Sequence, residues 1–120
     1  MPVTQINKRE MRKLVIEQLK DYRALKIQLQ NKQEREEAGA VDLFPVIRTG
    51  YLTELKIKQI ERALNHTLDF LERTIIEQRY LKPTQIKDIE IYMNLGLSKN
   101  SFYNIRNRAL ETIATALGMI

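Results

Sequence analysis

Apolar residues recur at helical spacing through most of the chain. From Gln5 to Ala38 they are separated by alternating steps of four and three residues, the pattern of an amphipathic helix that buries one side. This stripe consists of Met11, Val15, Tyr22, Leu25 and Leu29, with Gln18 in the one polar position and Leu14 and Leu19 beside it. Charged residues form the outer side of the predicted helix: Glu17, Lys20, Asp21, Arg23 and Lys26. The polar stretch 31–37 is expected to be a fraying helix end or an exposed spacer, closed by Gly39.

The helical pattern breaks between Ala40 and Gly50, where Pro45 interrupts the chain. This connector still contains apolar residues, which predict that it packs against the rest of the protein: Val41, Leu43, Phe44, Val46 and Ile47. We therefore divide the chain into an N-terminal helical arm with its connector, residues 1–50, and a C-terminal domain, residues 51–120.

Helical spacing resumes after the connector and continues to Tyr80, with Thr53 as the expected N-cap. The segment is either one helix or two helices joined near residues 65–67. Pro83 is expected to end it, and Thr84 to cap a short helix that follows. That short helix has as its apolar residues Ile86, Ile89, Ile91, Tyr92 and Met93. No segment has the pattern of a β-strand, so the predicted fold class is all-α.

The most informative segment runs from Leu95 to Leu110 and reads LGLSKNSFYNIRNRAL. Gly96, between two leucines, tolerates the positive φ that a tight turn between crossing helices needs. Ser98 can cap the following helix by accepting a hydrogen bond from the amide of Asn100 or Ser101. One side of that helix is apolar and is expected to pack on the preceding helices: Phe102, Ile105, Ala109, Ile113 and Ala116. This arrangement is typical of the turn and second helix of a DNA-binding helix-turn-helix.

The opposite side of this last helix is polar. It carries Asn100, Tyr103, Asn104 and Asn107, with Ser101 and Arg108 at its flank. An Asn amide offers a donor and an acceptor together, which suits it to reading base edges. Lys99, Arg106 and Arg108 can contact phosphates, and no acidic residue occurs between Gly96 and Arg108. An ordinary solvated surface is the alternative interpretation of such a polar side.

Composition adds limits to this picture. The formal net charge of +5 allows an anionic partner without requiring one. The chain has no Cys and a single His, His66, which is expected on a helix surface or half-buried, so neither a metal site nor an enzyme is expected. No cofactor-binding loop is visible. No apolar run is long enough to span a membrane and no secretory signal is recognised, so a cytoplasmic protein is expected.

The C-terminal half resembles two families. Residues 68–117 resemble the fourth region of bacterial sigma factors. In that region a helix ending in Arg-Tyr precedes a helix-turn-helix, and the recognition helix continues into an Arg-Ala-Leu segment. The corresponding residues here are Arg79-Tyr80 and 108–110. The segment IYMNLGLSKNSFYNIRNRALETIATALGMI is similar to the ArpU/RinA-like family of phage late-gene regulators, including the closing Ala-Leu-Gly of residues 116–118.

The resemblance to sigma region four implies roles for individual residues. The base-reading positions correspond to Asn100, Ser101, Tyr103 and Asn104. The phosphate-contacting positions correspond to Lys99, Asn107 and Arg108, together with Thr84, Gln85 and Lys87 near the start of the first helix. The chain departs from the family at Tyr92, where a small residue is usual four positions before the turn glycine, so this ring must tilt outward or spread the two helices.

The predicted function is therefore sequence-specific binding to double-stranded DNA, as an activator of the late genes of a phage or mobile element in a bacterial cell. Because one helix-turn-helix buries little surface, we expect a homo-oligomer, most simply a dimer. The expected contact is the stripe of Met11, Val15, Tyr22, Leu25 and Leu29, for which packing within one chain is an equal alternative. Two other functions stay open: a DNA-packaging subunit resembling a small terminase, and an interaction module that contacts RNA polymerase or a repressor.

Overall fold

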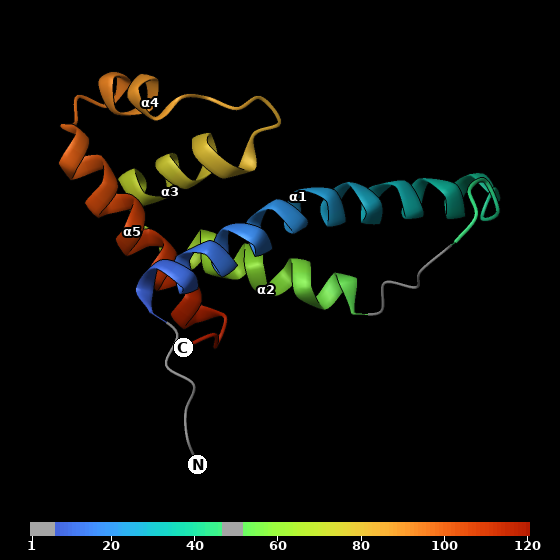
Figure 1. The fold of residues 1–120 in the computed structure, drawn as a ribbon. Coiled ribbons are helices and arrows are strands. Elements are labelled where there is room, and N and C mark those ends of the chain that lie inside the picture. The colour runs from blue at the N-terminus through green and yellow to red at the C-terminus, as the bar shows by residue number, and fades with distance from the viewer. Residues whose placement is uncertain (1–6, 47–51) are drawn as a thin grey trace, which may run out of the picture.

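The protein is described here by a computed structural model that covers residues 7–46 and 52–120. Over these residues the chain is helical and has no strand, which confirms the all-α class. The elements, shown in Figure 1, are α1 (Lys8–Ala38), α2 (Thr53–His66), α3 (Phe70–Ile76), a π-helical turn η1 (Glu77–Leu81), α4 (Asp88–Asn94) and α5 (Lys99–Ala116). The α2 helix returns alongside α1, while α5 crosses the amino-terminal half of α1 (Figure 1).

Local capping signals set both ends of α1. The side chain of Asn7 accepts a hydrogen bond from the Glu10 amide at 2.8 Å, and the predicted start at Gln5 lies outside the described residues. The helix ends at Gly39, which has a left-handed φ of 67°. The amide of the next residue, Ala40, donates to the Arg35 carbonyl at 2.9 Å. The predicted end at Ala38 is thus confirmed, and the polar stretch 31–37 is an exposed part of the helix.

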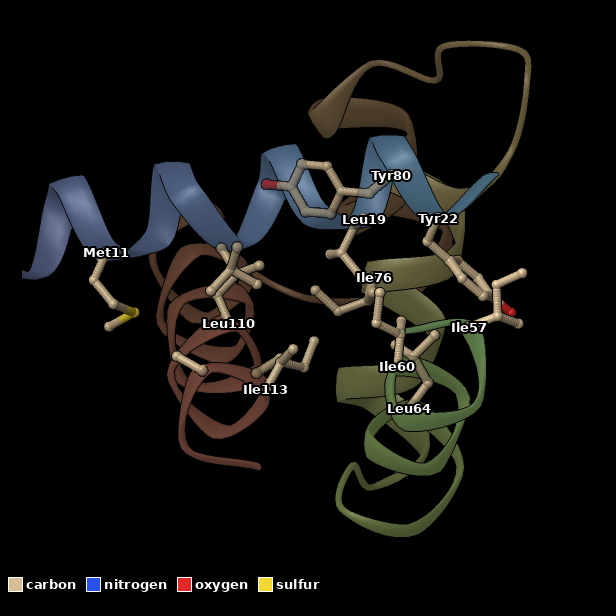
Figure 2. Close-up of a cluster of buried hydrophobic side chains, with 13 residues drawn as sticks. Met11, Leu19, Tyr22, Ile57, Ile60, Leu64, Ile76, Tyr80, Leu110 and Ile113 are labelled. Carbon is tan, nitrogen blue, oxygen red and sulfur yellow. The ribbon is translucent and has the colours of Figure 1, made fainter. Parts of the chain in front are cut away.

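The main hydrophobic core lies beneath the amino-terminal half of α1 (Figure 2). Val15 and Leu19 are fully buried in this core, which they share with Leu110 and Ile113 of α5 and with the apolar residues of α2. The helix that we expected to form an arm therefore shares one core with α2, η1 and α5. Burial of this kind is the main favourable contribution to folding in a small domain.

The predicted dimer contact must be corrected. Met11, Val15 and Tyr22 are buried by their own chain, and Leu25 and Leu29 are half-buried against the same core. The alternative, packing within one chain, is what the structure has, because α2 and α5 cover this stripe. A dimer through these five residues would require the core to open.

The connector differs from the prediction. Val41, Leu43 and Phe44 are 60%, 60% and 64% exposed, and Val46 is exposed as well. The expectation that the connector packs down is therefore wrong for residues 41–46. Its remaining residues, 47–50, lie outside the described part of the chain. The connector follows the far end of α1, away from α5 (Figure 1).

The segment from 53 to 81 forms two helices, which confirms the second of the two alternatives. Thr53 is the first residue of α2 rather than its N-cap, which is Leu52. The break falls at residues 67–69, where Asp69 starts α3 with a capping box: its carboxylate accepts from the Glu72 amide, and the Glu72 carboxylate accepts from the Asp69 amide. The α3 helix continues directly into η1, so this helix ends at Leu81, before Pro83 as expected.

The short helix begins later than predicted. Thr84 is not its N-cap: residues 82–87 are non-helical, Lys87 is the N-cap, and α4 starts at Asp88. Asp88 and Glu90 place negative charge in the first turn, where the positive end of the helix dipole favours it, whereas residues 84–87 contain no acid. A salt bridge between Arg79 and Asp88, 2.7 Å long, also fixes the start of the helix.

Leu19→Ala should lower the free energy of unfolding by about 2–5 kcal/mol, because a fully buried leucine would leave a cavity between α1, α2 and α5. Leu14→Ala, on the same helix but 38% exposed, is the matched control and should cost less than about 1 kcal/mol. Urea unfolding measures both values. Equal losses in the two variants would contradict the placement of α1 in the core.

Alkaline pH should destabilise the protein through Tyr22. Burial of its hydroxyl, together with the nearby Glu61 carboxylate, raises the pKa of Tyr22 to about 12, from 10.0. Because the folded state disfavours the ionised phenol, this contribution to stability is fully present below pH 10 and is lost as the pH rises from 10 to 12. The wild type should lose about 2 kcal/mol more than Tyr22→Phe over this interval in urea unfolding. Parallel pH profiles of the two proteins would show that Tyr22 titrates normally.

Candidate nucleic-acid interface

The turn between α4 and α5 has the geometry predicted for residues 95–98. Gly96 has a φ of 69°, and the Leu97 amide donates to the Tyr92 carbonyl at 2.8 Å. A Cβ at Gly96 would meet no atom within 4 Å, so the backbone conformation, not crowding, calls for glycine. Ser98 caps α5 by accepting from the Ser101 amide at 3.1 Å, one of the two donors expected.

A second, smaller core fastens this helix pair to α3. Ile75, Ile91 and Phe102 are fully buried, and Leu95 and Leu97 pack against them, as predicted for the two leucines of the turn. This core fixes how α4 and α5 are held on the rest of the protein.

Tyr92, the bulky residue at a position where sigma region four usually has a small one, is accommodated beside Phe102. The two rings meet edge to face, with centroids 5.8 Å apart and an interplanar angle of 61°. Tyr92 stays half-buried, so its ring joins the edge of the small core, where it links α4 to α5.

The buried side of α5 differs in part from the predicted one. Phe102, Ala109 and Ile113 are buried as expected, whereas Ile105 is half-buried and Ala116 is exposed. Two residues that were not predicted, Leu110 and Ala114, are fully buried. The reason is that α1 covers the second half of α5, which rotates the buried stripe toward these two residues.

The same rotation changes which polar residues are free. Lys99, Asn100, Ser101 and Asn104 are exposed on the first half of α5, as predicted. In contrast, the half-buried flank of the helix carries Tyr103, Arg106 and Asn107. The free polar side is therefore centred on Asn100, Ser101 and Asn104.

Tyr103 is engaged within the protein. Its hydroxyl donates to Asp88 Oδ2 at 3.0 Å, and this hydrogen bond to a carboxylate raises the pKa of Tyr103. Its ring packs edge to face on Phe102, and the Arg106 guanidinium lies 4.8 Å from the ring centroid. Arg106 in turn donates to Asn107 Oδ1 at 3.0 Å. These contacts make Tyr103 a link between α5 and α4, and its predicted role in base reading stays a prediction.

Asp88 is the centre of a polar junction that sequence reasoning missed. Its two oxygens accept from Arg79 Nε at 2.7 Å and from Tyr103, so they join η1 and α5 to the first turn of α4. The Arg79 guanidinium also lies 5.4 Å from the centroid of the Tyr80 ring. The only sequence signal for this junction was the Arg79-Tyr80 pair at the end of a helix.

Arg108 is also engaged. Its Nε donates to Glu72 Oε2 at 3.3 Å, and its Nη2 lies 3.6 Å from Asp69 Oδ2. Glu72 is only 6% exposed, so Arg108 supplies the positive charge for a buried carboxylate. The amide of Glu72, and to a smaller extent the charge of Arg108, lower the pKa of Asp69. The Asp-x-x-Glu spacing of residues 69–72 was the signal that could have revealed this capping box, though not its arginine.

The remaining predicted phosphate contacts lie before α4. Thr84, Gln85 and Lys87 are exposed, but because α4 begins at Asp88, Thr84 and Gln85 belong to a non-helical segment and not to a helix amino terminus. His66 is exposed at the end of α2, as expected.

Comparisons with models of known protein families, with curated proteins and with solved structures give no match for this chain. Among residues 7–46 and 52–120, none of the helices combines the length and the apolar character needed to cross a membrane.

Arg108→Ala should lower the free energy of unfolding by about 1–2 kcal/mol, a value reduced from that of a fully buried pair because the arginine side chain is 60% exposed. The double variant Arg108→Ala with Glu72→Gln should recover part of this loss, since it removes the unpaired charge. Lys99→Ala, at an exposed position, is the control and should stay within about 0.5 kcal/mol of the wild type. No loss in Arg108→Ala would leave the arginine free for a phosphate.

Proposed function

We propose that the protein is a sequence-specific DNA-binding transcriptional regulator that inserts the first half of α5 into the major groove of double-stranded DNA. The observation that carries the proposal is the helix pair α4–α5, joined by a left-handed glycine turn, with the polar first half of α5 exposed. The major groove admits one α-helix, and helix-turn-helix proteins contact bases with the amino-terminal residues of the second helix.

The chemistry of the exposed side supports this use. Asn100 and Asn104 present amides that can pair with an adenine edge through two hydrogen bonds, and Ser101 can donate or accept. Lys99 and Lys87 are exposed at the starts of α5 and α4, where they can contact phosphates on either side of the groove. The exposed first half of α5 carries amides, hydroxyls and Lys99 and no acidic residue, a composition that suits a polyanionic partner.

The engaged residues take supporting roles in this proposal. Tyr103 positions α5 against α4 through Asp88, and Arg108 holds α5 on α3 through Glu72. Base reading is therefore assigned to Asn100, Ser101 and Asn104.

The biological role rests on the resemblance to sigma region four and to the ArpU/RinA-like regulators. It suggests an activator of phage or mobile-element late genes in the bacterial cytoplasm, acting near RNA polymerase. Because α5 alone offers a small contact area, we propose that more than one copy binds each site. The stripe on α1 is buried, so the copies would meet through another surface.

A second candidate function is a protein-interaction module, which one observation favours. Ile89 and Met93, four residues apart on the outer side of α4, are 54% and 68% exposed. Such a pair offers an apolar contact to a protein partner next to the polar side of α5. A module of this kind would bind its best duplex no more tightly than random DNA.

Asn104→Ala tests the proposed function. Duplexes selected by the wild type from a random pool should bind the variant more weakly by about 1–3 kcal/mol, and a repeated selection should lose preference at one base position. The matched control is Thr115→Ala, an exposed residue of the same helix beyond the proposed contact, which should keep both affinity and preference. Gel-shift titrations at fixed salt measure the affinities. Equal binding of selected and random duplexes by the wild type would reject the proposal in favour of the interaction module.

A further inference from the structure

A hollow of ≈ 450 Å³ lies on the surface between α1, η1 and α5, bordered by the segment that follows Pro83. Five of its lining side chains are cationic, and none of the lining residues is acidic: the cations are Lys20, Arg23, Arg79, Lys82 and Arg106. They come from three separate parts of the sequence, so only folding brings these charges together. Like charges around one hollow repel each other, and an anion bound there would relieve that repulsion.

Most of this positive charge is not neutralised within the protein. Arg79 is paired with Asp88, but among the described residues the other four cations form no ion pair. Arg12, the neighbouring arginine of α1, is by contrast paired with Glu111. The lining of the hollow itself therefore has an excess of positive charge, although Lys20, Arg23 and Lys82 also border a neighbouring depression that contains Glu61 and Glu77.

Two of the arginines are held in place before any ligand arrives. The Asp88 carboxylate fixes Arg79, and the Asn107 side chain together with the Tyr103 ring fixes Arg106. Tyr80 also lines the hollow, with the Arg79 guanidinium 5.4 Å from the centroid of its ring, and burial raises the pKa of Tyr80. Preordered donors lose little conformational freedom when a ligand binds.

The cations on α1 extend the site outward. Lys20 and Arg23 are spaced as neighbours on one side of the helix, and Arg9 and Lys13 continue the same side toward its start. Glu17, four residues after Lys13 and three before Lys20, lies beside this row but does not line the hollow, and Asp21 falls farther round the helix. The hollow therefore lies at one end of a basic row that runs along the helix.

We propose that this basic hollow between α1, η1 and α5 binds a phosphate group. Guanidinium groups match the paired oxygens of a phosphate, and Lys20 and Lys82 add point charges at the rim. The phosphate belongs either to the backbone of the duplex that α5 reads or to a free phosphoanion. Binding of the DNA backbone rests on the proposed function and would extend the DNA contact from α5 onto α1. Binding of a free phosphoanion does not depend on the proposed function.

The test compares two double variants that each remove two positive charges. Lys20→Ala with Arg23→Ala alters the hollow through side chains outside the buried core, and Lys56→Ala with Lys58→Ala removes two exposed charges from α2, which does not line it. Circular dichroism checks that both remain folded. Pyrophosphate is titrated into each protein while NMR follows the Nε–H signals of the arginines, and a duplex is titrated at several salt concentrations.

The wild type and the α2 variant should bind pyrophosphate with shifts in the Arg79 and Arg106 signals, and the hollow variant at least tenfold more weakly. If the source is the DNA backbone, the hollow variant should also show a salt dependence of duplex binding reduced by about 1–2 in log–log slope. Pyrophosphate binding with an unchanged duplex slope would assign the site to a free phosphoanion. If the hollow variant matches the α2 variant with both probes, the proposal is overturned.

These outcomes separate the hollow from the proposed function. Base preference that persists in the hollow variant, without any effect on either probe, would reject the hollow and leave the function standing. Pyrophosphate binding by a wild type that has no affinity for any duplex would support the hollow and reject the function.

Discussion

The structure depends on α5 belonging to two cores at once. Its first half is buried through Phe102 against α3 and α4, and its second half through Leu110 and Ile113 against α1 and α2. The two halves bury different sides of the helix, so the side left free on the first half is fixed by packing along the whole helix. A change in how α1 docks would rotate that free side even though α1 contributes nothing to it.

Polar contacts then divide the residues near α5 into those that hold it and those that stay free. Asp88 accepts hydrogen bonds from Arg79 and Tyr103, and Glu72 accepts one from Arg108, so each carboxylate joins elements that are distant in sequence. A half-buried carboxylate needs such partners, because an unpaired charge away from water is costly. The side chains with the strongest electrostatic character are thereby committed to the fold, and the exposed side retains mainly amides, hydroxyls and a lysine.

Features that depend on neighbouring residues could be predicted from the sequence. Gly39 and Gly96 take left-handed conformations and Ser98 caps α5, because each of these signals acts within one turn. The predicted roles of Tyr103 and Arg108 as free contacts did not anticipate their partners, Asp88 and Glu72, which lie 15 and 36 residues away. Helical periodicity shows that a residue faces inward or outward, but not which distant carboxylate it meets. The same limit explains the stripe on α1, since periodicity marks an apolar side without saying whether a second chain or the same chain covers it.

The placement of α1 also bears on how the protein could bind a polyanion. As a separate arm, α1 would carry its basic row independently of α5, and Lys20 and Arg23 would be ordinary surface charges. Because α1 is docked across α5, Lys20 and Arg23 instead line the same hollow as Arg106. Arg106 lies on the half-buried flank of the proposed reading helix. Because the apolar stripe of α1 is buried in the core, α1 cannot serve as the dimer contact. The same docking places Lys20 and Arg23 of α1 in the wall of the proposed anion site. One packing arrangement determines both the orientation of the amides on α5 and the position of the positive charge beside them.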